Sequence, residues 1–296
     1  MEKYSQLFTE ASKGYWNYLS YEITHPRMDN YFYILIAISL IVWGLEIVFP
    51  WRKKQSIFRK DFWLDCFYMF FNFFIFNLIV FIGLSSITET LLLEGLNSLG
   101  IDLKNLQVID LGSTLFPYNL IFFFIITDFI QWLTHIALHK STFLWQFHKV
   151  HHSVKEMGFA AHLRYHWAET LVYKTTLYIP LAIIGGFNVD QVIFVHVIAI
   201  SIGHLNHANF SLNLGPFKYL FNNAKMHIWH HVKELPSNRK SGINYGISLS
   251  IWDYIFRTAY IPKDGKDIVL GFNDDEKFPK SFMGQEFYPL GSNKQS

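Results

Sequence analysis

The sequence predicts an all-α protein: an integral membrane helical bundle of about four to five spans with a cytoplasmic helical cap that carries a two-metal site. Two observations lead to this prediction. Hydrophobic residues make up 51% of the chain and charged residues only 16%, whereas an average soluble domain is about 25% charged. In addition, 13 of the 14 histidines lie between His135 and His231, which indicates chemistry rather than chance composition.

Composition also excludes several classes of protein. The chain has one cysteine, Cys66, so it forms no internal disulfide and no cysteine-based zinc finger. The formal net charge is only +2, without the strong basic excess of a nucleic-acid-binding protein. We therefore expect no nucleic-acid partner.

The N-terminal segment does not resemble a signal peptide. Residues 1–30 mix acidic and basic side chains and contain no continuous apolar core. We expect an amphipathic segment that lies at the membrane surface.

Five apolar segments are candidate membrane spans, since a transmembrane helix needs about 20 mostly apolar residues. The first three are long, and the last two are shorter and form a hairpin around the glycine-containing turn at 185–188. The segments are 31–49, 62–84, 118–138, 171–184 and 189–205.

The loops between the spans predict the orientation. The loop after the first span carries five basic residues and no acid before Asp61, whereas the predicted loop 85–117 carries four acids and Lys104 as its one base. The positive-inside rule then places the first loop in the cytoplasm and the second outside. The third span returns to the cytoplasm near His139, and the polar segment from Ala208 onward stays there. The five basic residues are Arg52, Lys53, Lys54, Arg59 and Lys60.

Ten of the histidines form four short clusters, all at the predicted cytoplasmic ends of spans or in cytoplasmic segments. Residues three and four apart lie on one face of a helix, so each cluster can direct two or three imidazoles at one point. In chain order they are HxxxH (His135, His139), HxxHH (His148, His151, His152), HxxH (His204, His207) and HxxHH (His227, His230, His231).

Ten imidazoles suggest two metal ions, because one ion takes four to six ligands and imidazole suits zinc, copper, iron and nickel. Asp128 precedes His135 by seven residues on the same helix face and is a candidate partner that orients an imidazole. Two other interpretations of these histidines are that they only pack inside the bundle or that they ligate a haem. A metal transporter is the alternative of another class, although its ligands belong near mid-membrane, often with acids.

These motifs together resemble the fatty acid hydroxylase/sterol desaturase superfamily. The segment TDFIQWLTHIALH is similar to the family's helix with an Asp followed by HxxxH. FHKVHHSVKEMGFAAHLRYH is similar to its HxxHHS box and the Arg-x-His that follows, and NYGISLSIWDYIFRT to its closing motif. The resemblance covers roughly residues 118–260. The closing motif falls on Asn244, Tyr245, Gly246, Trp252 and Asp253.

The resemblance implies a non-haem diiron centre in a catalytic domain at 118–260, after an N-terminal membrane region at 1–117 (two spans and the interfacial segment) and before a cytoplasmic tail at 261–296. It also implies O₂ as co-substrate and a helical membrane stem under a cytoplasmic cap. The implied metal ligands are His135, His139, His148, His151, His152, His204, His207, His227, His230 and His231.

Several residues near the histidine boxes are not implied metal ligands, and we expect other positions for them. His166 matches the family's Arg-x-His and is a candidate neighbour of the site, whereas His162 is expected at the surface or outside the ligand set. His196 is expected inside the bundle. Gly158 stands where the family often has Asn. Glu156, Glu169 and Glu234 flank the boxes and are expected to be solvated or to cap helices.

The predicted function is hydroxylation of a membrane lipid, such as a fatty acyl chain or a sterol, with O₂. Desaturation on the same two irons is the alternative. The chain has no G-x-G-x-x-G fingerprint and no cysteine set for an iron–sulfur cluster. We therefore expect a separate ferredoxin, cytochrome or flavin reductase to supply electrons, at the cytoplasmic face of a bacterial inner membrane or an endoplasmic reticulum.

Overall fold

A computed structural model describes residues 2–27, 29–76, 82–100, 117–184, 189–239 and 241–291. Within these ranges all regular elements are helices, and β pairing is limited to two isolated bridges, Phe221 with Leu249 and Val232 with Leu270. The predicted all-α class is therefore confirmed.

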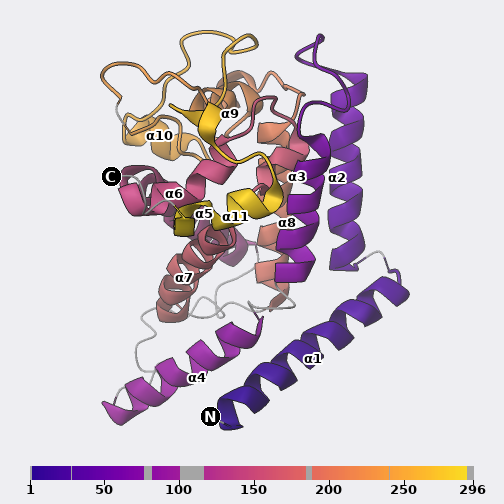
Figure 1. The fold of residues 1–296 in the computed structure, drawn as a ribbon, viewed down its shortest axis with the longest axis vertical. Helices are drawn as coiled ribbons and strands as arrows, with labels where there is room; N and C mark the ends of the chain where they lie inside the picture. Colours follow the sequence, from indigo (N-terminus) through magenta and orange to yellow (C-terminus); the bar gives the residue numbers. More distant parts are fainter. Residues whose placement is uncertain are drawn as a thin grey trace.

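A bundle of helices forms the body of the molecule, and short helices and loops form a cap at its upper end, beside the top of the bundle (Figure 1). The bundle consists of α2 (Tyr31–Val48), α3 (Phe62–Phe70), α5 (Tyr118–Lys140), α7 (Trp167–Ile184) and α8 (Val189–His207). Two of them, α2 and α5, are long and apolar enough to cross a membrane, with mean hydropathies of 2.2 and 1.7. The shorter apolar helices are Phe62–Ile75 and Gln191–His207.

The predicted second span differs from the structure. After Phe70 the helix continues as a π-helix, η1 (Phe71–Ile75), and residues 77–81 lie outside the described part. Residues 82–84 belong to a separate helix, α4 (Ile82–Ser98), which runs in another direction from α3 (Figure 1). The first half of the predicted loop 85–117 is therefore helical, as far as Ser98. This helix packs along the N-terminal helix.

The N-terminal segment forms α1 (Glu2–Thr24), which lies along α4 at the end opposite the cap (Figure 1). Lys3 and Glu94 form an exposed ion pair between the two helices. The ring of Phe8 occupies the space beside Gly83, where a Cβ would be only 2.2 Å from the ring. The segment is helical, and its expected position at a membrane surface remains a prediction.

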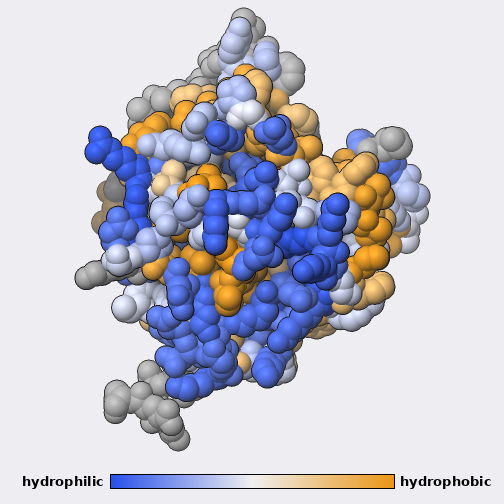
Figure 2. Space-filling view, turned by 90° about the horizontal axis from the view of Figure 1, so that it is seen from above, coloured by the Kyte–Doolittle hydropathy of each residue, from blue (hydrophilic) through white to orange (hydrophobic). Residues whose placement is uncertain are grey.

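The cap is built from short helices that follow and precede the long ones. Seen from above, most of its surface is covered by hydrophilic side chains (Figure 2). Its elements are α6 (Thr142–His152), η5 (Phe159–Leu163), η6 (Gly215–Tyr219), α9 (Ala224–His230), α10 (Ile251–Ile255), η7 (Asp275–Lys277) and α11 (Phe282–Gly291).

Buried apolar residues join the segments of the cap that carry histidines. Ile228 and Trp229 on α9 pack with Val154, Met157 and Ala161, which follow the last histidine of α6. Burial of a large apolar side chain stabilises the fold by roughly 1.5–3 kcal/mol. This core therefore fixes α9 relative to the chain that leaves α6.

A buried ionic network ties the basic loop 52–60 to the helices below it. Arg59 Nη2 lies 2.6 Å from Asp65 Oδ2, and Arg164 Nη1 lies 3.0 Å from Asp65 Oδ1. Gly158 permits this arrangement, since a Cβ there would be 2.2 Å from Arg59 Nε. Of the five predicted basic residues, Arg59 is thus buried inside the protein, whereas Lys53 and Lys54 are exposed.

Candidate metal centre

Nine of the ten predicted ligands gather into two groups of imidazoles. In each group one ring nitrogen from every histidine lies within 4.8 Å of the others, and all are buried except the half-buried His139. The first group, called the five-histidine group, is His135, His139, His148, His152 and His230; the second, the four-histidine group, is His151, His207, His227 and His231.

Each HxxHH box supplies both groups. On α6, His148 and His152 are four residues apart and face the five-histidine group, whereas His151 faces the four-histidine group. The corresponding pair His230–His231 at the end of α9 divides in the same way. Neighbouring helical residues point about 100° apart, so the adjacent histidines of a box reach two centres instead of one.

The spacing of the nitrogens fits one ion in each group. His148 Nε2 lies 3.1 Å from both His135 Nε2 and His139 Nε2. In the four-histidine group, His227 Nε2 lies 3.0 Å from His207 Nε2. Two nitrogens that bind one ion at about 2.1 Å, with about 90–110° between the bonds, lie about 3.0–3.4 Å apart. The donors are therefore already at ligand spacing.

Backbone carbonyls hold the outer nitrogens of several rings. His135 Nδ1 donates to the Tyr245 carbonyl, and His230 Nδ1 to the Ile243 carbonyl, each at 2.8 Å. A carbonyl oxygen only accepts, so the proton lies on Nδ1 and leaves the Nε2 lone pair free for a metal. His152 Nε2 is buried without a hydrogen-bond partner among the described residues, as expected of an atom that awaits a metal.

Glu169 is a member of the site that the sequence reasoning missed. Its Oε1 lies 2.9 Å from His148 Nδ1, and its side chain is fully buried. The expected solvated or capping role is therefore wrong for this residue. One signal in the sequence could have found it: Glu169 is the one acid in helix α7.

Asp128 does not orient an imidazole directly, as expected, but holds a backbone segment that does. Its carboxylate accepts hydrogen bonds from the Ser248 backbone N–H and Trp252 Nε1, each at 2.9 Å, and no bond to an imidazole is found among the described residues. It therefore fixes the segment whose Tyr245 carbonyl accepts from His135.

The closing motif forms the wall behind the five-histidine group. Asp253 accepts from the Tyr245 and Gly246 backbone N–H groups at 2.9 and 2.7 Å. Asn244 adopts a left-handed conformation, φ 53°, and accepts from the Tyr260 N–H at 2.7 Å. Gly242 has φ +138°, and a Cβ there would be 2.9 Å from the Tyr245 hydroxyl. The motif thus holds the carbonyl that orients His135.

Besides the exposed His25, four histidines lie outside both groups. His204, predicted as a ligand, places Nε2 3.2 Å from Ser39 Oγ and Nδ1 3.2 Å from His162 Nδ1. His162 is buried rather than at the surface. His166 is buried against α11 and donates from Nε2 to the Glu286 carbonyl at 2.7 Å. His196, expected inside the bundle, is exposed.

The environment keeps the grouped imidazoles in the form that binds metal. Burial, reinforced for most of them by neighbouring imidazoles, lowers their pKa well below the ordinary value of 6.5. Near neutral pH they are uncharged, as metal ligation requires. This holds for His148, His151, His152, His227, His230 and His231.

Residues 120–258 match the fatty acid hydroxylase family, and the predicted resemblance is confirmed. The chain is 30% identical over 166 residues to ornithine lipid hydroxylase OlsE of Rhizobium tropici. The aligned stretch is 56% of this chain and 48% of that protein. The chain is also 29% identical over 143 residues to alkylglycerol monooxygenase of Caenorhabditis elegans. Here the aligned stretch is 48% of this chain and 27% of that protein.

The chain thus spans about half the length of one of these curated relatives and about a quarter of the other. No solved structure matches it.

Proposed function

Because residues 120–258 match the fatty acid hydroxylase family, we propose that this chain is a membrane-bound non-haem diiron hydroxylase of a lipid. The observation that carries the proposal is the pair of buried, imidazole-only groups inside the matched region. The two relatives, an ornithine lipid hydroxylase and an alkylglycerol monooxygenase by name, favour a lipid substrate and favour hydroxylation over desaturation; a fatty acyl chain, a sterol or a related lipid is the proposed substrate class.

The nine grouped histidines are the proposed iron ligands, and His204 is left outside this set. An all-imidazole donor set suits iron, and five and four nitrogens leave open positions on six-coordinate ions, as catalysis needs. When bound, the two irons would supply activation of O₂ and the oxidising power to attack a C–H bond.

The protein's own residues orient the donors and exclude water. The Tyr245 and Ile243 carbonyls and the Glu169 carboxyl hold imidazoles of the five-histidine group in register. Because this group is largely buried, bulk water has little access to the reacting centre. In this proposal the lipid C–H bond reaches the irons from the membrane side of the cap.

The proposed topology keeps the stem in the bilayer and the cap in the cytoplasm. On α2, Leu40, Ile41 and Val48 are 57%, 63% and 64% exposed, which supports contact with lipid. We propose that α3, α7 and α8 also enter the bilayer. The catalytic domain is then 118–260, preceded by the membrane region 1–117 and followed by the segment 261–296.

Electrons come from a separate protein in this proposal. A ferredoxin, a cytochrome or a flavin reductase would dock on the hydrophilic cap surface (Figure 2). The five-histidine and four-histidine groups both lie in elements of this cap or at the cap ends of α5 and α8.

Metal content tests the proposal directly. The full chain, purified anaerobically, should hold about two irons, and His148→Ala and His230→Ala should lose them, whereas His25→Ala, an exposed histidine outside the groups, should not. Loaded protein supplied with ¹⁸O₂, reductant and lipid should yield a product with one labelled oxygen. An alkene without label would favour desaturation, and ion flux without O₂ consumption would favour a transporter.

A further inference from the structure

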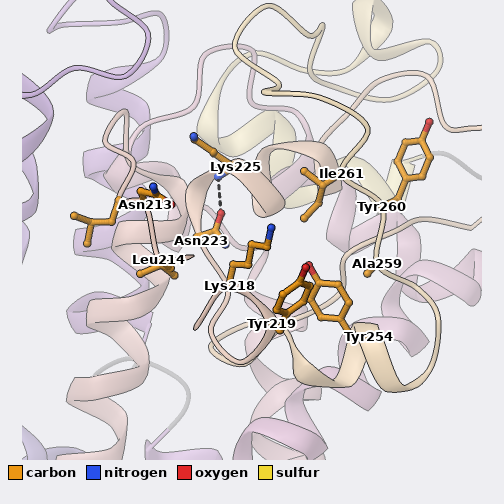
Figure 3. Close-up of a pocket in the computed structure, with 11 residues that line it drawn as sticks. Asn213, Leu214, Lys218, Tyr219, Asn223, Lys225, Tyr254, Ala259, Tyr260 and Ile261 are labelled. Carbon is orange, nitrogen blue, oxygen red and sulfur yellow. Dashed lines mark hydrogen bonds between the residues drawn. The ribbon is translucent and has the colours of Figure 1, made fainter. Parts of the chain in front are cut away.

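A cavity of about 470 Å³ opens in the cap between η6 and the segment after α10 (Figure 3). None of the nine grouped histidines lines it. Its volume falls within the range of about 300–1,000 Å³ typical of small-molecule sites. Its polar lining includes two lysines and three tyrosines and, among the lining residues, no carboxylate: Lys218, Lys225, Tyr219, Tyr254 and Tyr260.

Donor groups meet in the middle of this cavity. The Lys218 amine extends toward the hydroxyl ends of Tyr219 and Tyr254 (Figure 3). Lys218 Nζ lies 5.0 Å from the centre of the Tyr219 ring, and the Tyr219 and Tyr254 rings are 5.0 Å apart at an angle of 69°. Lys225 lies at the rim, where its backbone N–H donates to Asn223 Oδ1 (Figure 3).

The charge in this cavity is not balanced by the protein. Neither lysine has an ion-pair partner within the described part of the chain. An ammonium group and phenolic hydroxyls all donate hydrogen bonds. The matching ligand is therefore an anion with several acceptor oxygens, such as a phosphate or a carboxylate.

The segment that lines one side of the cavity also carries exposed apolar side chains. Leu212, Phe217 and Leu220 are 53%, 62% and 37% exposed, and all belong to the segment that follows α8. Lysines beside exposed aromatic and aliphatic residues are typical of the boundary between hydrocarbon and headgroups. A free anion would leave these apolar residues without a role, whereas a lipid would cover them with its chains.

We propose that this cavity lies where the cap meets the bilayer surface and binds the anionic headgroup of a membrane lipid, with the acyl chains against Leu212 and Phe217. The inference rests on the membrane placement in the proposed function and not on its oxidative chemistry. It assigns the phosphate or carboxylate to Lys218 and the two tyrosine hydroxyls, with Lys225 as a second cation at the rim.

Lipid retention tests the proposal. The full iron-loaded chain in detergent is mixed with equal amounts of phosphatidylglycerol and phosphatidylcholine and examined by native mass spectrometry. The parent should retain one phosphatidylglycerol in preference to phosphatidylcholine. Lys218→Glu combined with Lys225→Glu should weaken retention at least about tenfold, since each cation near an anionic lipid contributes about fivefold.

Two further variants separate charge from folding. Ala259→Trp fills the cavity, which Ala259 lines, without changing charge, and should also abolish retention. Lys53→Glu combined with Lys54→Glu makes the same charge change on exposed lysines elsewhere and should leave retention as in the parent. Iron content is measured in every variant, so that loss of the metal centre is recognised separately.

Three outcomes would overturn the inference. The first is equal retention of both lipids by the parent. The second is parental retention in the lysine pair and in Ala259→Trp. The third is displacement of phosphatidylglycerol by inorganic phosphate at equal affinity, which would identify a free-anion site and not a lipid site.

Discussion

At the scale of single residues, the Glu169 carboxyl group positions His148, one proposed ligand of the five-histidine group. Glu169 is fully buried and bonded to His148. Removal of such an outer partner typically costs 10–100-fold in metal affinity. We expect Glu169→Ala to weaken iron binding by about this factor while the helical circular dichroism stays unchanged, and Glu169→Gln, which keeps an acceptor oxygen, to recover part of the affinity.

Chelator competition on the purified chain measures this affinity. Glu234→Gln is the matched control, because Glu234 is exposed and should bind iron as the parent does. Parental affinity in Glu169→Ala would mean that the carboxyl does not position His148.

The histidines and the carboxyl differ in how far the sequence reveals them. Each of the four histidine clusters contains a local spacing of three or four residues, which puts those members on one helix face and makes the clusters visible in the sequence. The bond between His148 and Glu169 spans a turn and a change of helix, so no local spacing encodes it. For the same reason the division of each HxxHH box between two groups, and the position of His204 outside them, required the fold.

Gly242 is a position where the backbone accepts no side chain. Its φ of +138° and the 2.9 Å approach to the Tyr245 hydroxyl leave no room for a Cβ. Strain of this kind costs about 1–3 kcal/mol. Gly242→Ala should lower the midpoint of thermal unfolding and the iron content together, whereas Gly95→Ala, with nothing within 4 Å, should lower neither.

At the scale of helices, long apolar windows predicted element ends well. The windows 31–49 and 118–138 correspond to α2 (Tyr31–Val48) and α5 (Tyr118–Lys140). The window 62–84 does not correspond to one helix, because its first part forms α3 and η1 and its last residues belong to α4. Asn72 lies in the π-helical turn and donates to the Leu163 and Tyr165 carbonyls at 3.1 and 3.0 Å, which hydropathy cannot reveal.

Loss of the Asn72 amide should therefore destabilise the junction between α3 and η5. Asn72→Leu would leave two buried or half-buried carbonyls without their donor, at about 1–3 kcal/mol for an unsatisfied group. We expect a lower unfolding midpoint in thermal melts, with Asn97→Leu on the exposed face of α4 as control. A melt identical to that of the parent would show that these bonds do not hold the junction.

At the scale of the whole molecule, the histidine groups link stability to pH. Six grouped imidazoles have a pKa held well below 6.5 in the folded state. A group with a lowered folded pKa stabilises the fold above its unfolded value and loses this contribution as the pH falls below it. Metal-free protein should therefore melt at steadily lower temperature as the pH falls from 6.5.

Metal-loaded protein should resist this loss, because protons must first displace the ions. Melting curves of the two forms between pH 8 and 5 provide the comparison. Parallel curves for the two forms would contradict the proposed ligand set.

Both histidine groups take donors from α6 and α9, and this affects how tightly the second metal ion binds after the first. An ion that enters one group fixes the same two helices that present the other group's donors. The second ion then meets an ordered site and binds more tightly than the first, since the entropy of ordering has already been spent. Sub-stoichiometric titration should consequently produce a mixture of empty and doubly occupied molecules, with few that hold a single ion.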